Sequence, residues 1–156
     1  MKAAPVQSRT ALVTGCSTGI GLATVRLLRS RGWTVWPTAR KEDDLARLSA
    51  EGFEPISLDL LKPESVRGAA DEVIRRGSGH FGALVNNAGY GQPGAVEDIP
   101  REALRRQFEV NVFGLQELTN RVLPAMRKQG YGRIVNVSSV VGRLAQRIAP
   151  ARLLPV

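Results

Sequence analysis

The sequence is poor in several residue types and features, and each shortage excludes a class of protein. One cysteine, Cys16, excludes an intramolecular disulfide. There is one histidine, His80, which we expect at the surface, and we predict no metal site. No stretch approaches the roughly 18 apolar residues of a membrane span, and residues 1–10 do not resemble a signal peptide. We therefore predict a cytoplasmic protein with no membrane partner.

Acidic residues are also scarce. Asp and Glu number 14 against 22 Lys and Arg, which gives a net charge of +8. Such an excess can indicate a nucleic-acid partner. Here the basic residues are scattered along predicted helix surfaces without a run of five, so we favour a site for an anionic ligand and predict no nucleic-acid partner. A chain of 156 residues is long enough for one domain and too short for two.

Short apolar runs alternate with helical patterns along most of the chain. The predicted strands are 10–15, 33–40, 53–60, 83–89 and 132–139. The predicted helices are 20–32, 41–52, 62–77 and 100–130. This alternation predicts an α/β fold, a doubly wound parallel sheet (Rossmann) with about five strands and helices on both faces. In such folds ligands bind at the carboxyl ends of the strands.

Two of the predicted helices carry apolar stripes. The stripe of helix 20–32 is predicted to be Ile20, Ala23, Leu27 and Leu28. The stripe of helix 100–130 is predicted to be Leu104, Phe108, Leu115 and Val122. Asn111 falls within the second stripe, and a buried amide without partners costs roughly 1–3 kcal/mol. We therefore expect Asn111 to be hydrogen-bonded, either as a structural amide that kinks the helix or in a functional role. Pro124 is a second candidate for a kink.

The loop between the first strand and the first helix is rich in glycine. It reads VTGCSTGIG over 13–21, with Gly15, Gly19 and Gly21. Positions without a Cβ let the backbone approach a pyrophosphate and let the helix pack closely on the strand. The following helix directs free N–H groups at the phosphates. The spacing predicts a dinucleotide-binding loop, and the alternative is a tight turn that binds nothing.

Three further motifs follow in order. They are NNAG at 86–89, VNV at 110–112 and GRIVNVSS at 132–139. Together with T-G-x-x-x-G-I-G they resemble the short-chain dehydrogenase/reductase family over about residues 9–145. The resemblance implies an N-terminal extension at 1–8, an incomplete NAD(P)-binding Rossmann domain at 9–145 and an atypical tail at 146–156. It also implies hydride transfer between a nicotinamide and a small-molecule alcohol or ketone.

The resemblance assigns cofactor-binding roles to four segments. The loop residues that would bind the diphosphate side are Gly15, Ser17, Thr18, Gly19, Ile20 and Gly21. The residues that would contact the adenine edge are Asp59 and Leu60. The residues that would lie under the cofactor and stabilise the sheet are Asn87, Ala88 and Gly89. Alternatively, Asp59 caps a helix, and the amides of residues 86–87 only satisfy loose backbone groups.

The end of the second predicted strand bears on the choice of cofactor. Family members that prefer NAD have an acid there for the ribose 2′-hydroxyl. This chain has Ala39 and Arg40 instead. A guanidinium suits phosphate oxygens, so Arg40 is predicted to pair with a 2′-phosphate and to favour NADP over NAD. The alternative is a solvated surface arginine.

The resemblance also implies catalytic roles for two residues. Ser139 matches the serine that hydrogen-bonds the substrate oxygen, and Asn111 matches the residue that holds a water in the proton relay. Hydride transfer to a carbonyl also needs a proton donor, and the family uses Tyr-x-x-x-Lys about a dozen residues past the serine. This chain has only Tyr90 and Tyr131, and no lysine after Lys128.

The region where that pair is expected has an unusual composition. Its sequence after Gln146 reads RIAPARLLPV and fits neither helix nor strand. A shifted reading frame, a genuine short form and a shortened chain are three explanations. We expect this chain to have little or no activity, and the alternative is a non-catalytic dinucleotide-binding module or an inert remnant. The fifth strand should lie at an exposed edge, which favours a homo-oligomer through helix 100–130.

Overall fold

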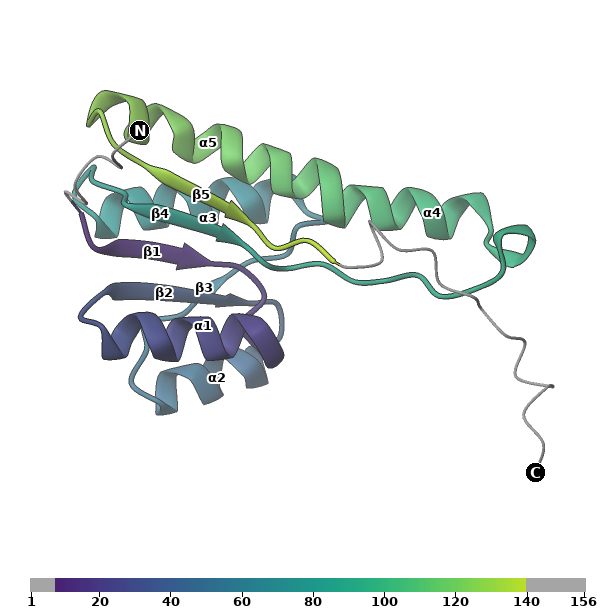
Figure 1. Cartoon of the computed structure of the whole chain (residues 1–156), viewed down its shortest axis with the longest axis horizontal. Helices are drawn as coiled ribbons and strands as arrows, with labels where there is room; N and C mark the ends of the chain where they lie inside the picture. Colours follow the sequence, from purple (N-terminus) through teal and green to yellow (C-terminus); the bar gives the residue numbers. More distant parts are fainter. Residues whose placement is uncertain (1–7, 140–156) are drawn as a thin grey trace.

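A computed structural model describes residues 8–139, and the tail 146–156 lies outside the described residues. Its centre is a parallel sheet of five strands in the order β3-β2-β1-β4-β5 (Figure 1). The strands are β1 (Thr10–Val13), β2 (Thr34–Ala39), β3 (Ile56–Ser57), β4 (Ala83–Asn86) and β5 (Arg133–Asn136). The predicted doubly wound α/β fold is confirmed, with strands shorter than the apolar runs suggested.

Helices cover both faces of the sheet (Figure 1). One layer consists of α1 (Gly19–Ser30) and α2 (Glu42–Ala50), and the other of α3 (Pro63–Arg76) and α5 (Leu115–Lys128). Side chains alternate between the two layers along each strand. In β1, for example, Val13 packs in the core on the α1 side, whereas Leu12 packs with α3 and α5. Because both faces are covered, the central strands consist almost entirely of buried residues.

The stripe predicted for the first helix is confirmed only at Leu28, which packs against the core. Ile20 and Leu27 are 63% and 51% exposed, while Gly21 and Val25 are the buried residues of α1. A Cβ on Gly21 would overlap the Gly15 carbonyl, so the close approach at this glycine sets which face of the helix is inward. Steric fit at one small residue therefore overrides the pattern of large apolar residues.

The long helix predicted at 100–130 is interrupted. After a short 3₁₀ turn, η1 (Val96–Asp98), the chain forms α4 (Arg101–Phe108), a π-helical segment η2 (Glu109–Gly114) and then α5. Asn111 lies in the π-helical segment, whereas Pro124 lies inside α5 without ending it. The extra residue in the π-helical turns changes the register of the stripe. Leu104 and Phe108 are about half exposed on α4, which projects past the carboxyl ends of the strands (Figure 1).

Strand β5 forms one edge of the sheet, and all four of its residues are exposed. Val135 is 49% exposed, and Ile134 and Val137 are 38% and 39% exposed. Within residues 8–139 the fifth strand is therefore uncovered, as the sequence predicted. No helix in this part of the chain is both long and apolar enough to cross a bilayer.

The carboxyl ends of β1 and β4 are joined through one buried hydroxyl. The Thr14 hydroxyl oxygen accepts hydrogen bonds from the backbone N–H groups of Asn87 at 2.9 Å and Ala88 at 2.8 Å. In return, the Asn87 side-chain amide donates to the carbonyls of Thr14 at 2.9 Å and Gly15 at 3.0 Å. These bonds hold the loop after β1 against the loop after β4.

We expect Thr14→Val to destabilise the fold by about 1–3 kcal/mol, because valine keeps the shape but leaves two buried N–H groups without an acceptor. Thr14→Ser retains the acceptor and serves as the control. Urea unfolding followed by circular dichroism measures both variants. Equal unfolding midpoints for the valine and serine variants would show that the hydroxyl is not what joins the strands.

A second prediction concerns Gly114 in the π-helical segment, where an added Cβ would overlap the Leu60 carbonyl. We expect Gly114→Ala to destabilise the fold by about 1–3 kcal/mol. Gly68 is the matched control, because it lies in the interior of α3 and a Cβ there meets no atom within 4 Å. Gly68→Ala should instead stabilise the protein by about 0.5–1 kcal/mol. Denaturant midpoints shifted in the same direction would contradict this packing.

Candidate functional site

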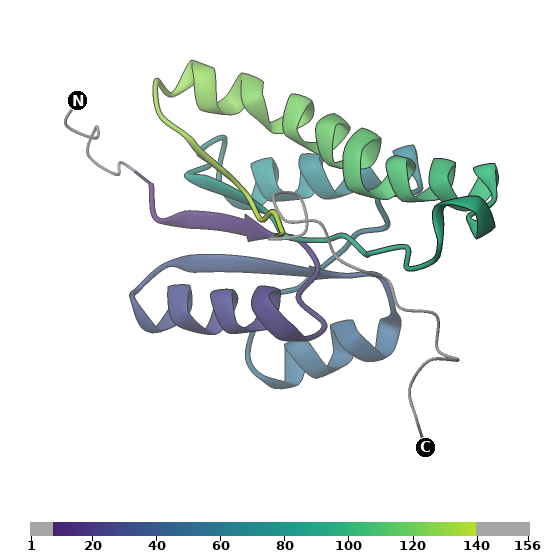
Figure 2. The same cartoon turned by 45° about the vertical axis from the view of Figure 1, so that its right-hand side comes forward.

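A cavity of about 970 Å³ lies at the carboxyl end of the sheet. Figure 2 shows these strand ends between the α1–α2 layer and the layer of α3, α4 and α5. Most of the predicted cofactor residues line the cavity: Gly15, Ser17, Thr18, Gly19, Ile20, Arg40, Asp59, Leu60, Asn87, Ala88 and Gly89. The structure therefore brings together residues from four segments that are far apart in the sequence.

The three glycines of the loop differ in what they do. Gly15 and Gly19 have positive φ angles of +70° and +60°, which strain other residues. A Cβ on Gly15 would also lie 2.8 Å from the Ala88 Cα. Gly21 does not line the cavity, and lies beneath it against Gly15 and the Asn87 amide. Close contacts therefore leave no room for a side chain at Gly15 and Gly21, whereas Gly19 is favoured by its backbone angle alone.

The N-terminus of α1 opens into the cavity. Its N-cap residue, Thr18, makes no side-chain capping bond, and the first turn contains no acid. The first N–H groups of a helix have no partner within the helix, and they carry partial positive charge. Gly19 and Ile20 place this end at the cavity wall. The arrangement fits an anionic group such as a diphosphate.

The end of β2 adds two cations. Arg40 lines the cavity and makes no hydrogen bond or ion pair with another described residue. Lys41, beside it, also lines the cavity and was not identified from the sequence. Asp44, one turn into α2, was missed as well because the first turn of a helix commonly carries acids. Its carboxylate is paired with Arg47, 2.8 Å away.

The segment after β3 forms a compact turn around Asp59. One carboxylate oxygen accepts the Leu61 N–H at 3.1 Å, and the Asp59 N–H donates to the Ser65 hydroxyl at 2.9 Å. Lys62, not Asp59, is the N-cap of α3, so the capping alternative is wrong, although Asp59 still closes a local turn. The apolar residues that line this part of the cavity are Leu58, Leu60, Leu61 and Val110. Together with a carboxylate they suit a purine ring and its polar edge.

Asn111 is hydrogen-bonded, as expected, but it does not line the cavity. Its side-chain oxygen accepts the Tyr90 N–H at 3.1 Å, and its side-chain nitrogen donates to the Tyr90 carbonyl at 2.8 Å. Gln107 also donates to this carbonyl at 3.2 Å. The Tyr90 backbone is therefore held from α4 and the π-helical segment, which places Tyr90 itself at the cavity wall.

The remaining predicted residues lie apart from the cavity. Ser139 is exposed after β5 and does not belong to the described cavity lining. Asn86 is 2% exposed and donates to the Asn136 side chain at 2.9 Å, which supports a structural role. His80 is exposed in the loop before β4, as predicted. Within residues 8–139 no three His, Cys, Asp or Glu residues group as metal ligands.

Cys16 lies in the glycine loop but is fully buried. Burial raises the pKa of its thiol to about 12, against the weaker opposing effect of a backbone hydrogen bond with Thr38. The thiol donates to the Val13 carbonyl, 3.1 Å away. At neutral pH it is therefore a protonated core residue, and neither a nucleophile nor a metal ligand.

Three comparisons with known proteins agree with this geometry. The chain is 44% identical over 140 residues to the uncharacterized oxidoreductase YbbO of Escherichia coli, a match that covers 90% of this chain and 52% of that protein. A short-chain dehydrogenase from Streptomyces avermitilis has a similar structure, with a TM-score of 0.82 and 41% identity over 89% of this chain and 52% of that one. A crystal structure of the F189W actinorhodin polyketide ketoreductase with NADPH has a TM-score of 0.82 and 34% identity, over 92% of this chain and 58% of that one.

The chain spans about half the length of the curated relatives it matches. A sequence model of the short chain dehydrogenase family matches residues 9–151, which is nearly the whole chain. The matched residues include the glycine loop, the NNAG segment and all five strands of the sheet. The chain therefore belongs to the short-chain dehydrogenase family of oxidoreductases.

Proposed function

We propose that this chain binds NADPH in the cavity and contributes the cofactor-binding part of an oxidoreductase. The observation that carries this proposal is the cavity's set of charges. Arg40 and Lys41 are the first two residues after β2, ahead of the acids in the first turn of α2. The N-terminus of α1 faces the same cavity. The side chains of Arg40 and Lys41 are suited to bind a 2′-phosphate, and the N-terminus of α1 is suited to bind a diphosphate.

The cofactor, when bound, supplies the hydride for interconversion of an alcohol and a ketone. The chain's residues bind and orient it. The loop residues that would hold the diphosphate side are Gly15, Ser17, Thr18, Gly19 and Ile20, with Gly21 beneath them. Asp59 and Leu60 would bind the adenine. Asn87, Ala88 and Gly89, at the end of β4, would support the bound cofactor. The Gly15 position supports this assignment, because a Cβ there would overlap the segment after β4.

In this proposal residues 9–145 form the NAD(P)-binding domain, and two of these residues contribute to catalysis. Asn111 positions the Tyr90 backbone at the cavity wall, which supports a role in arranging the reacting end of the site. Ser139 would hydrogen-bond the substrate oxygen. The substrate is a small-molecule alcohol or ketone, and the protein acts in the cytoplasm. Exposed apolar residues on α4 and η2, including Leu104, Phe108 and Phe113, support a homo-oligomer through this region.

A second candidate function is a dinucleotide-binding module without catalysis. It is favoured by the sequence, in which neither tyrosine is followed by lysine four residues later. Purified protein that binds NADPH but consumes none with a panel of ketones and quinones would support this second function. Oxidation of NADPH by any of these compounds would support the enzyme.

The proposed NADP preference makes a direct prediction for Arg40. We expect Arg40→Ala to weaken NADPH binding by about tenfold or more, because a charge-assisted hydrogen bond to phosphate is lost. NADH lacks the 2′-phosphate, so its dissociation constant should stay within about twofold. Calorimetric or fluorescence titration measures both constants.

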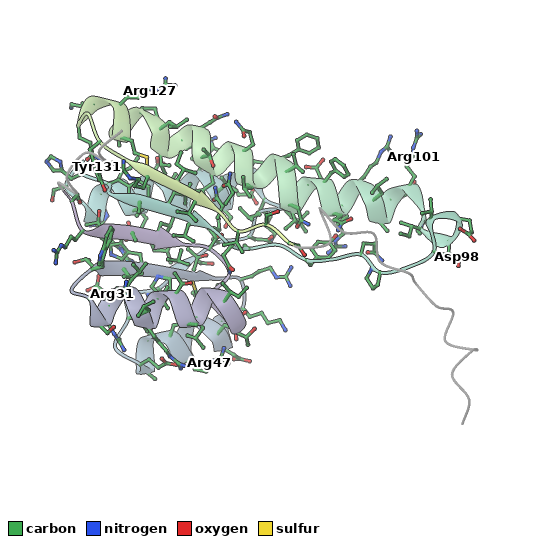
Figure 3. All side chains as sticks on the ribbon, in the orientation of Figure 1. Arg31, Arg47, Asp98, Arg101, Arg127 and Tyr131 are labelled. Carbon is green, nitrogen blue, oxygen red and sulfur yellow. The ribbon has the colours of Figure 1, made fainter. Side chains whose placement is uncertain are left out.

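Arg31→Ala is the matched control. Arg31 follows α1 at the end opposite to the cavity (Figure 3) and does not line it. Its removal lowers the net charge by the same amount and should leave both dissociation constants unchanged. An Arg40→Ala protein that binds NADPH as tightly as the parent would refute the assignment.

A further inference from the structure

Arg47 bridges two parts of the cavity wall without lining the cavity itself. Its Nη2 atom donates to the Ser17 carbonyl of the glycine loop and to the Asp44 carboxylate, the latter at 2.8 Å. Ser17 and Asp44 both line the cavity. Figure 3 labels Arg47 on α2, in the helix layer that also contains α1. One guanidinium thus connects the phosphate-binding loop to the helix that follows Arg40.

The negative charge of Asp44 is unfavourable in a cavity that should receive a 2′-phosphate. It shares the wall with Arg40 and Lys41, so an unpaired carboxylate there would repel the phosphate. A free carboxylate would also be a good acceptor for a ribose 2′-hydroxyl, which only the cofactor without the phosphate presents. The Asp44 side chain is 20% exposed and that of Arg47 is 48% exposed, so the acid is the less screened of the two charges.

We propose that Arg47 determines cofactor specificity by holding Asp44 in an ion pair. While the pair is intact, a 2′-phosphate meets the positive charge of Arg40 and Lys41 with the nearby acid neutralised. Without Arg47, Asp44 opposes the phosphate and becomes available to a 2′-hydroxyl. Arg47 is therefore a positioning residue for the cofactor. This inference rests on the proposed binding of NADPH in this cavity.

The bond from Arg47 to Ser17 gives a second, separable effect. It holds the glycine loop, which contacts the diphosphate common to both cofactors. Loosening the loop should weaken the binding of NADPH and of NADH by the same factor. Exposing the Asp44 carboxylate should weaken the binding of NADPH alone. The ratio of the NADPH and NADH dissociation constants therefore measures the effect of the ion pair. A purely structural role for Arg47 would leave this ratio unchanged.

The test is a double-mutant cycle with Arg47→Met and Asp44→Asn, in which both cofactors are titrated into the parent and three variants. We expect Arg47→Met to reduce the preference for NADPH over NADH by about fivefold, the size of a modest charge interaction near a surface. In the Asp44→Asn background the same change should alter the preference by less than about twofold. Asp44→Asn alone should keep or increase the preference for NADPH.

Arg26→Met is the matched control. Arg26 forms a bidentate pair with Glu51 at 2.7 and 2.9 Å, which also connects the α1–α2 layer, yet neither residue lines the cavity. This variant removes one paired surface arginine and should leave the preference unchanged. Circular dichroism melts establish that all the variants are folded before titration.

Two failures can be told apart. A parent that binds NADH as tightly as NADPH would refute the proposed NADP preference. A parent that prefers NADPH, but keeps that preference in Arg47→Met, would refute the role of Arg47 alone. The change Arg47→Met could also reduce the preference for NADPH equally in the parent and in the Asp44→Asn background. That result would refute the role of Arg47, because the effect would then not depend on the ion pair.

Discussion

The rest of the structure depends on the close backbone contact between the ends of β1 and β4. Four hydrogen bonds, at distances from 2.8 to 3.0 Å, cross this junction and join Thr14 and Gly15 to Asn87 and Ala88. Gly15 and Gly21 let the backbones meet, because a Cβ at either position would collide with the facing segment. The same contact sets the direction of α1, whose N-terminus then opens into the cavity. The arrangement of the sheet ends and the position of the cavity thus depend on one steric constraint.

The placement of charge explains why a basic chain need not bind nucleic acid. Several arginines are paired with acids on helix surfaces: Arg26, Arg47, Arg75, Arg76 and Arg121. Paired hydrogen bonds from Arg75 and Arg76 lower the pKa of Glu72 to about 2, so this acid stays ionised at any physiological pH. Arg40 and Arg106 line the cavity without such partners among the described residues. Part of the net charge is therefore concentrated where an anionic ligand fits.

The sequence was most informative where geometry admits few residue types. Most of the residues selected by the glycine spacing and the NNAG motif line one cavity, because close backbone contact excludes other residues at several of these positions. The sequence was less informative about which large apolar residues of a helix face the core. The α1 stripe failed at Ile20, which is exposed at the cavity instead of packing in the core. Asp44 was missed because an acid in the first turn of a helix is common and does not by itself indicate a binding site.

The described cavity takes its lining from residues between Gly15 and Val110, and none from β5. Ser139, which follows β5, is exposed and stands apart from that lining. The proposed dinucleotide-binding residues and Ser139 therefore come from different segments of the chain. Asn111 connects the π-helical segment to the loop after β4, because its side chain holds the Tyr90 backbone at the cavity wall. Because the π-helical segment interrupts the α-helical repeat between α4 and α5, the residues after it do not continue the stripe of α4.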